Sequence, residues 1–398
     1  MKKHSDFEEL IDLVSLGSIE SIEKYSSKIN LSRVRIGEFG LSLLHFAAWN
    51  NRPEICKYLI KKGVDPEASE KFSGKTALHF AAYLGNIEVV IALIESGAEG
   101  LITNKSVDCL ACHPIHYAAM IGNKEMIDFF LNLPNFNRRE RACSIASQSC
   151  LGNILDIFIR KRNYELLDYY SPIGGVSAIE TNPRLYSDLY IGYRNEYQWS
   201  SIHYAAVMGD LQSLEILLKH FPNPTCLQEE YRKHYFFSPG EVAIAEGHIQ
   251  VAKLLNYDVD VTSYRDSLKI YALRKDEPEY MLRLANAIIE RDKGAINDFL
   301  DKYGVDILSK KSFKTDNTQY YEKVKFNAFS IACRCFALSF LSHINEKNIE
   351  VSALEFTKDG GRDIVEIPFF NWALMDVNPF GEGFFGKISK SLSLSNVS

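Results

Sequence analysis

The chain has 398 residues, which is enough for two or three domains and for a sizeable core without disulfides or metals. Its apolar fraction of 46% and charged fraction of 24% exclude disorder along most of the chain. The net charge of −6 lacks the basic excess with which proteins neutralise phosphates, so we expect no nucleic-acid partner. The most apolar stretches are short and bounded by polar residues, which predicts no membrane span.

Neither the N-terminus nor the cysteines indicate export through a cleaved signal peptide. Carboxylates interrupt any apolar region behind Lys2 and Lys3 at Asp6, Glu8, Glu9 and Asp12. The eight cysteines are scattered, as is typical of free thiols in a reducing compartment. We therefore expect a cytoplasmic protein.

The first predicted element is a pair of short helices. Apolar residues recur at helical spacing before and after Gly17, at Phe7, Leu10, Ile11, Val14, Ile19 and Ile22. The pair has the form of a cap at one end of an array.

Four later stretches share one pattern. Leu-His-Phe-Ala-Ala occurs at 44–48 and 78–82, and Ile-His-Tyr-Ala-Ala at 115–119 and 202–206. The first two histidines, His45 and His79, lie 34 positions apart. Small alanines allow close helix approach, and the glycines that follow, such as Gly85, suit a left-handed turn into a second helix.

This pattern resembles the ankyrin repeat, a β-turn finger followed by two antiparallel helices. The resemblance implies an all-α solenoid whose recurring histidines are buried and bridge neighbouring repeats. It also implies a protein partner, with no cofactor. We expect a monomer.

Weaker copies extend the array. Ser238–Pro239 with Gly247 fits, although Glu241 replaces the histidine, and Ile145–Ala146 fits with a turn at Gly152–Asn153 and a second helix from Ile154. Leu284–Ile289 with Ala295–Leu300 and Ala328–Ala332 with Ala337–Leu341 are weaker still.

We divide the chain at the limits of these copies. The predicted parts are an N-terminal capping pair (1–36), repeats with three clear copies and one degenerate copy (37–162), an aromatic-rich insertion (163–198), repeats with one clear copy and two degenerate copies (199–308), and a degenerate repeat with a C-terminal segment and mobile tail (309–398).

Two patterns suggest chemistry. Cys109-x-x-Cys112-His113 matches a haem attachment sequence, and adding His116 gives a zinc set, but in the repeat frame these residues belong to a finger and a helix start. We expect no metal and no catalytic residue. The alternative is an enzyme with a composite cysteine–histidine site, drawn from Cys143, Cys150, Cys333, Cys335, His220, His234 and His343.

The predicted partner site is an aromatic and apolar groove. In ankyrin arrays the fingers and the exposed side of the first helix vary and bind partners. Here those positions carry large apolar residues, which mark binding surfaces. The predicted contacts are Phe39, Trp49, Phe72, Tyr83, Leu84, Leu110, Met120, Ile121, Tyr197, Trp199 and Met208. The alternative is that the insertion or the C-terminal segment covers this groove.

In composition and in its Ser-rich tail the chain also resembles ankyrin effectors that intracellular bacteria inject through a type IV secretion system. That resemblance implies a host-protein partner and delivery into the host cytoplasm without a cleaved signal peptide. The alternative is a resident cytoplasmic adaptor.

Overall fold

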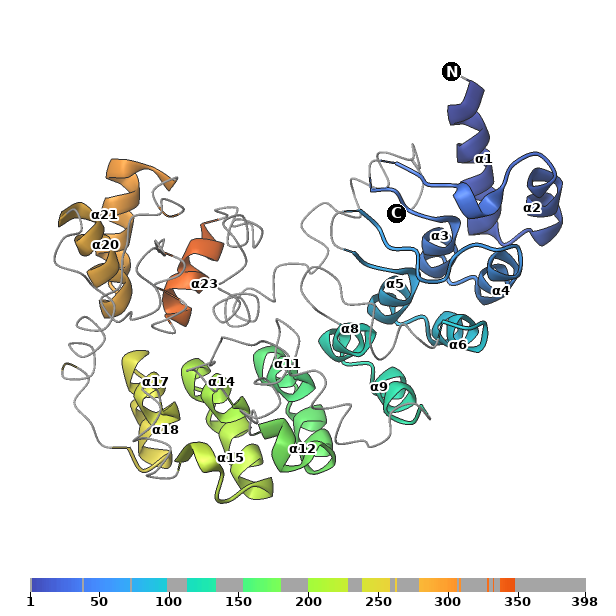
Figure 1. Cartoon of the computed structure of the whole chain (residues 1–398). Coiled ribbons are helices and arrows are strands. Elements are labelled where there is room, and N and C mark those ends of the chain that lie inside the picture. Colours follow the sequence, from blue (N-terminus) through green and yellow to red (C-terminus); the bar gives the residue numbers. More distant parts are fainter. Residues whose placement is uncertain are drawn as a thin grey trace, which may run out of the picture. The chain divides into compact units, whose positions relative to one another are not determined.

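The computed structural model describes residues 2–37, 39–71, 74–98, 113–133, 153–179, 200–227, 238–257, 279–305 and 337–347, with residues 262, 308, 328 and 332. The described residues form helices that fall into two compact units (Figure 1). Unit 1 has its described residues within 2–133, and unit 2 has them within 153–347. In the described part of the chain, no helix is both long enough and apolar enough to cross a membrane.

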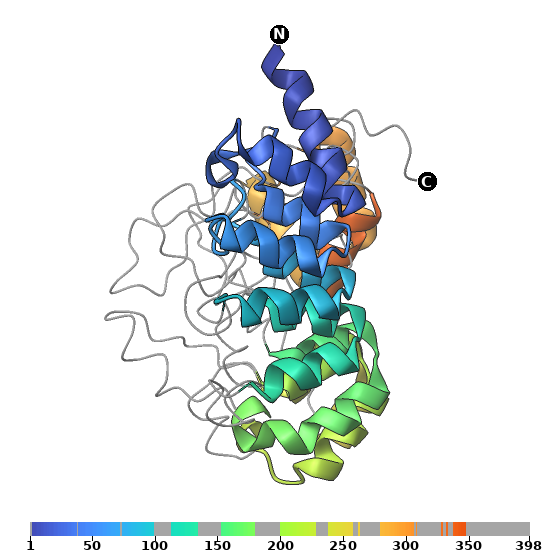
Figure 2. The ribbon, with the colours of Figure 1, turned by 90° about the vertical axis from the view of Figure 1, so that its right-hand side faces the viewer.

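Unit 1 is built from helix pairs. They are α1 (Lys2–Leu16) with α2 (Ile19–Ser26), α3 (Leu43–Trp49) with α4 (Pro53–Lys61), α5 (Ala77–Leu84) with α6 (Ile87–Glu95), and α8 (Pro114–Ile121) with α9 (Lys124–Leu131); the 3₁₀ helix η1 (Leu31–Arg33) follows α2. The first helix of each pair, here called the inner helix, packs on the next inner helix in the order α1, α3, α5, α8 (Figure 2). The predicted all-α solenoid is confirmed.

Unit 2 repeats this arrangement. Its pairs are α11 (Ile154–Lys161) with α12 (Tyr164–Ile179), α14 (Ser201–Met208) with α15 (Leu211–His220), α17 (Pro239–Ala245) with α18 (Ile249–Leu254), and α20 (Glu279–Glu290) with α21 (Lys293–Tyr303); η3 (Thr225–Leu227) and α23 (Leu338–Glu346) complete it. The inner helices α11, α14 and α17 stack in that order, and α12 packs on α15.

Alanines set the spacing of the inner helices. The paired alanines of the four clear copies are at most 1% exposed, at Ala47, Ala48, Ala81, Ala82, Ala118, Ala119, Ala205 and Ala206. Because close-packed interiors leave no room for extra methylenes, these positions accept only small side chains.

Each pair turns at a residue in the left-handed backbone region. These residues are Gly17, Asn51, Gly85, Gly122, Arg162, Gly209, Gly247 and Arg291. The predicted role of the turn glycines is confirmed. Three pairs make the same turn with a residue other than glycine, which costs backbone strain and hides the turn from sequence inspection.

The equivalent turn at Arg162 corrects the predicted register of the weak copy near 150. The sequence suggested a turn at Gly152–Asn153, with Ile154 in the second helix. In the structure Asn153 is instead the N-cap of α11, an inner helix that packs on α14. The first half of the segment expected to be an insertion, 163–198, is therefore the outer helix α12 of this pair. Residues 180–199 lie outside the described residues.

Hydrogen bonds join neighbouring helix pairs near the C-terminal ends of the inner helices, where each pair turns. The side chain at the N-cap of an outer helix donates to a carbonyl near the C-terminal end of the inner helix in the preceding pair. Asn86 Nδ2 lies 2.8 Å from the Ala48 oxygen in unit 1, and His248 Nε2 lies 3.1 Å from the Val207 oxygen in unit 2. At the opposite end, fingers precede α3 and α5, and the Lys71 amide donates to the Phe39 oxygen of the preceding finger at 2.9 Å. The repeats are thus tied at both ends.

Candidate functional site

One position recurs in six inner helices. The side chain three residues beyond the N-cap accepts a hydrogen bond from the backbone N–H of the N-cap residue, a capping box that satisfies an otherwise unpaired donor. The accepting residues are His45, His79, His116, Asp156, His203 and Glu241. Asp156 and Glu241 therefore accept the N-cap hydrogen bond in the two repeats that have no histidine at this position.

His45 shows how the histidine also bridges repeats. Its Nδ1 accepts from the Ser42 amide at 3.1 Å, so the ring hydrogen lies on Nε2, which donates to the Lys75 oxygen of the next finger at 3.0 Å. Burial lowers the pKa of His45 from 6.5 to about 4, opposed by the bond to Lys75, so the ring is neutral at pH 7. The structural role predicted for this histidine is confirmed.

Asp156 places a carboxyl group at the same position in α11. Its Oδ2 accepts from the Asn153 amide at 2.8 Å, and its Oδ1 accepts from Ser201 Oγ on α14 at 2.5 Å. Burial raises the pKa of Asp156 from 3.8 to about 7, and the two donors oppose that rise. The sequence analysis missed this residue, although Asn153 three positions earlier is a capping signal.

The aromatic residues predicted on the inner helices of unit 1 make equivalent contacts. The rings of Trp49 and Phe80 have centroids 6.1 Å apart, and those of Tyr83 and Tyr117 have centroids 6.2 Å apart, edge to face. In each case a half-buried ring rests on a buried ring of the next repeat, which orders it while the ring stays partly exposed.

Two apolar residues extend this surface. Leu84 is 38% exposed and Ile121 is 42% exposed, each at the last position of its inner helix. Met120 is half-buried beside Ile121. We call the set Trp49, Tyr83, Leu84, Met120 and Ile121 the inner-helix stripe. In unit 2, Met208 is half-buried and is the last residue of α14, as Leu84 and Ile121 are the last residues of α5 and α8.

None of the predicted finger residues adds exposed area to this surface among the described residues. Phe39 is only 9% exposed, because its finger packs against the array, so it offers little area to a partner. Phe72, Leu110, Tyr197 and Trp199 lie outside the described residues.

The described residues bring together none of the sets predicted for haem attachment, zinc binding or a cysteine–histidine site. Cys109, Cys112, His234 and the four cysteines proposed for a composite site lie outside the described residues. His113 and His116 are a helix N-cap and a capping-box acceptor, while His220 Nε2 contacts Asp168 Oδ1 at 2.6 Å. Among the described residues, no three metal-ligating side chains come together. Of the described cysteines, Cys56 is free and buried, and burial raises the pKa of Cys56 to about 12, so its thiol is unreactive. Cys226 is buried, and its Sγ accepts from Ser200 Oγ at 3.4 Å.

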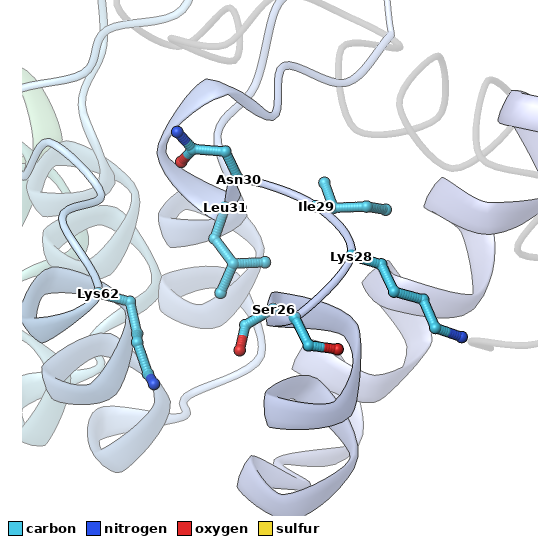
Figure 3. Close-up of a pocket in the computed structure, with 7 residues that line it drawn as sticks. Ser26, Lys28, Ile29, Asn30, Leu31 and Lys62 are labelled. Atoms are coloured by element: carbon cyan, nitrogen blue, oxygen red, sulfur yellow. The ribbon is translucent and has the colours of Figure 1, made fainter.

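An open pocket of about 420 Å³ lies at the ends of the outer helices α2 and α4, and Figure 3 shows the side chains that line it. Residues 26–31 and Lys62 line it. Lys62 Nζ lies 3.1 Å from Glu23 Oε1, and this contact raises the pKa of Lys62. The pocket belongs to the outer helices and contributes nothing to the inner-helix stripe.

The comparison with protein families agrees with the helix pairs of unit 1. A family model described as ankyrin repeats (3 copies) matches residues 10–105. Among solved structures, the chain is similar to the ankyrin repeat domain of Bcl-3, titled a unique member of the IκB protein family, with 18% identity and a TM-score of 0.44. That match covers 61% of this chain and 97% of the Bcl-3 chain. No curated protein matches the sequence.

Proposed function

We propose that this ankyrin-repeat protein is an interaction scaffold that binds a protein partner through the inner-helix stripe. The observation that carries the proposal is the repetition of one contact: Trp49 and Tyr83 each rest on a ring of the next repeat and stay partly exposed. Ordered aromatic rings lose little conformational entropy on binding, and they dominate binding energy at protein interfaces.

The surroundings of these rings support an apolar contact. Leu84 and Ile121 add exposed aliphatic area along the same row of helices. A partner that presents apolar side chains to this row would gain burial over several repeats. We expect no nucleic-acid partner, because the chain has net charge −6.

Matched substitutions test the stripe. Leu84 and Ile19 are both 38% exposed, but Leu84 lies on an inner helix and Ile19 on the outer helix α2. We expect Trp49→Ala or Tyr83→Ala to weaken binding by about 2 kcal/mol or more, and Leu84→Ala to weaken it measurably. Ile19→Ala should leave binding unchanged.

The assay is capture from a eukaryotic lysate followed by titration of the captured protein, beside thermal melts of each variant. Equal binding by all four variants would contradict the proposal. A destabilised Trp49 or Tyr83 variant that still captures its partner would show instead that the stripe only packs against the protein itself.

We further propose that the partner is a host protein and that the chain acts in the host cytoplasm as a translocated bacterial effector. The composition and the Ser-rich tail, residues 389–398, support this idea. Deleting the tail should leave the melting temperature unchanged and abolish transfer into a host cell. No transfer of the full chain would favour a resident adaptor, whereas transfer without the tail would show that the tail is not the transfer signal.

A further inference from the structure

A buried carboxylate in unit 2 contacts both the turn between α20 and α21 and the helix α23. Glu246 directly follows α17, and its side chain is 4% exposed. Its Oε1 accepts from Arg291 Nε at 2.8 Å, and its Oε2 accepts from the Ser339 amide at 3.2 Å. The carboxylate thus joins the end of α17 to the turn between α20 and α21 and to the first turn of α23 (Figure 1).

The helices beyond Glu246 are connected to one another. α20 packs closely on α21, whereas α17 packs closely on α14 and α18. His343 Nε2 on α23 lies 2.9 Å from Asn297 Oδ1 on α21, which links the third helix to the pair. We call α20, α21 and α23 the closing block.

Arg291 stands where other repeats have glycine. Its φ is +60°, close to the +67° of Gly209 and the +85° of Gly247 at the equivalent turns. A side chain is unfavourable in this region of backbone space, and it persists where the surroundings hold it. Here the arginine side chain is 7% exposed, and its Nη1 donates to the Ile289 oxygen at 2.6 Å. The ion pair gives a reason for an arginine at this turn.

The contact between α17 and the closing block is polar, and some of its buried polar atoms have no hydrogen-bond partner. Burying two charges costs desolvation, and losing either partner leaves an uncompensated charge inside the protein. Among the described residues, Asn286 Oδ1 on α20 and Ser339 Oγ on α23 are buried without a hydrogen-bond partner. Unsatisfied buried groups favour an open state in which water reaches them.

We propose that the closing block is a conformational device that detaches from unit 2 as one piece when the Glu246–Arg291 pair is broken. The array that ends at α18 stays folded, since its own contacts do not include this pair. The device is independent of the inner-helix stripe.

Arg291→Gly in the full-length protein tests this directly. Glycine suits the backbone of the turn, so a turn-only role predicts an unchanged or more protected block. The proposal predicts that amide hydrogen exchange in 279–303 and 338–346 accelerates about tenfold or more, while exchange in α14, α15, α17 and α18 changes less than about twofold. The matched control is Arg162→Gly, which makes the same backbone change at φ +53° where the arginine is exposed. The control should not accelerate exchange.

Glu246→Gln separates the ion pair from the turn. It removes the charge, keeps an acceptor for the Ser339 amide, and leaves residue 291 untouched. We expect the same accelerated segments as in Arg291→Gly. Three outcomes would overturn the proposal: slow exchange of the block in either variant, acceleration of only one of its two segments, or equal acceleration of α14 to α18.

Discussion

The capping position in the inner helices is filled differently in the two units. In α3, α5 and α8 of unit 1 the acceptor is a histidine, whereas in α11, α14 and α17 of unit 2 it is Asp156, His203 and Glu241. All six side chains accept the same N-cap N–H. The repeat therefore requires an acceptor at this position, and the residue type is secondary.

The difference lies in ionisation. A buried imidazole is neutral at pH 7, because burial lowers the pKa of His45 to about 4. A buried carboxyl at the same position is near its midpoint, because burial raises the pKa of Asp156 to about 7. His45 and Asp156 should therefore make the stability of their units respond to pH in opposite directions.

The largest expected effect is at Asp156. In the folded protein the carboxyl keeps its proton up to about pH 7, but in the unfolded chain it loses its proton near pH 3.8. The contribution of Asp156 to the stability of unit 2 is therefore full below pH 3.8 and is lost as the pH rises to about 7. At about 1.4 kcal/mol per pKa unit this amounts to about 4 kcal/mol. Asp156→Asn keeps an acceptor and removes the charge, so it should protect α11 and α14 from hydrogen exchange at pH 8. Equal protection in wild type and variant at pH 8 would mean that Asp156 is ionised without cost.

His45 should give the next largest effect, with the opposite sign. Because folding disfavours the protonated ring, the contribution of His45 to the stability of unit 1 is full above pH 6.5 and is lost as the pH drops to about 4, by about 3 kcal/mol. His45→Gln keeps a capping-box acceptor and does not titrate. Exchange of α3 measured between pH 7 and 4 should depend less on pH in the variant. An unchanged pH profile would contradict the assigned role of His45.

Enlarging a buried alanine between inner helices should destabilise the two units by similar amounts. Ala81 in α5 and Ala205 in α14 are both fully buried at equivalent positions, two residues beyond the histidine. We expect Ala81→Leu and Ala205→Leu each to cost about 1–3 kcal/mol by overpacking, measured by denaturant unfolding. Wild-type stability of either variant would show that the repeat register drawn for that unit is wrong.

The smallest effect concerns the hydrogen bonds at the turns. Asn86 Nδ2 in unit 1 and His248 Nε2 in unit 2 donate to a carbonyl of the preceding repeat. Asn86→Ala and His248→Ala should each cost about 1 kcal/mol, the usual value of such a bond. Asn50 also donates, to Ser15 Oγ, but it is not an N-cap, and Asn50→Ala provides a reference for an ordinary polar contact. Losses that differ widely between units would show that the bond is not equivalent in them.

The clear repeats could be predicted because their signals are local. Paired alanines and a turn glycine each answer a steric requirement that few other residues meet, as at Ala81, Ala82 and Gly85. The histidine motif carries two hydrogen bonds from one ring. These signals were sufficient for the inner helices α3, α5, α8 and α14.

The weak repeat at 153–179 was misplaced because other residues meet the same requirements. Asp156 accepts the N-cap N–H that a histidine accepts elsewhere, and Arg162 adopts the backbone conformation that glycine adopts elsewhere. Neither substitution is apparent from residue identity, since both depend on what the surrounding repeat stabilises.

Part of the candidate site was predictable for the same reason. Repeat spacing places Trp49 and Tyr83 at equivalent positions, but it does not give their contacts with Phe80 and Tyr117, which belong to the next repeat. The burial of Phe39 depends on packing of its finger against the array, which periodicity does not report.

The central claim is that one hydrogen-bond acceptor position organises the inner helices of both units, and that a histidine at this position is buried and neutral. Nitrogen NMR of histidine-labelled protein at pH 6 tests it most directly, because it distinguishes neutral from protonated rings and identifies the nitrogen that carries the hydrogen. We expect His45, His79, His116 and His203 to be neutral, with the hydrogen on Nε2 and Nδ1 as the acceptor. A protonated ring, or a hydrogen on Nδ1 at any of these four positions, would contradict the account.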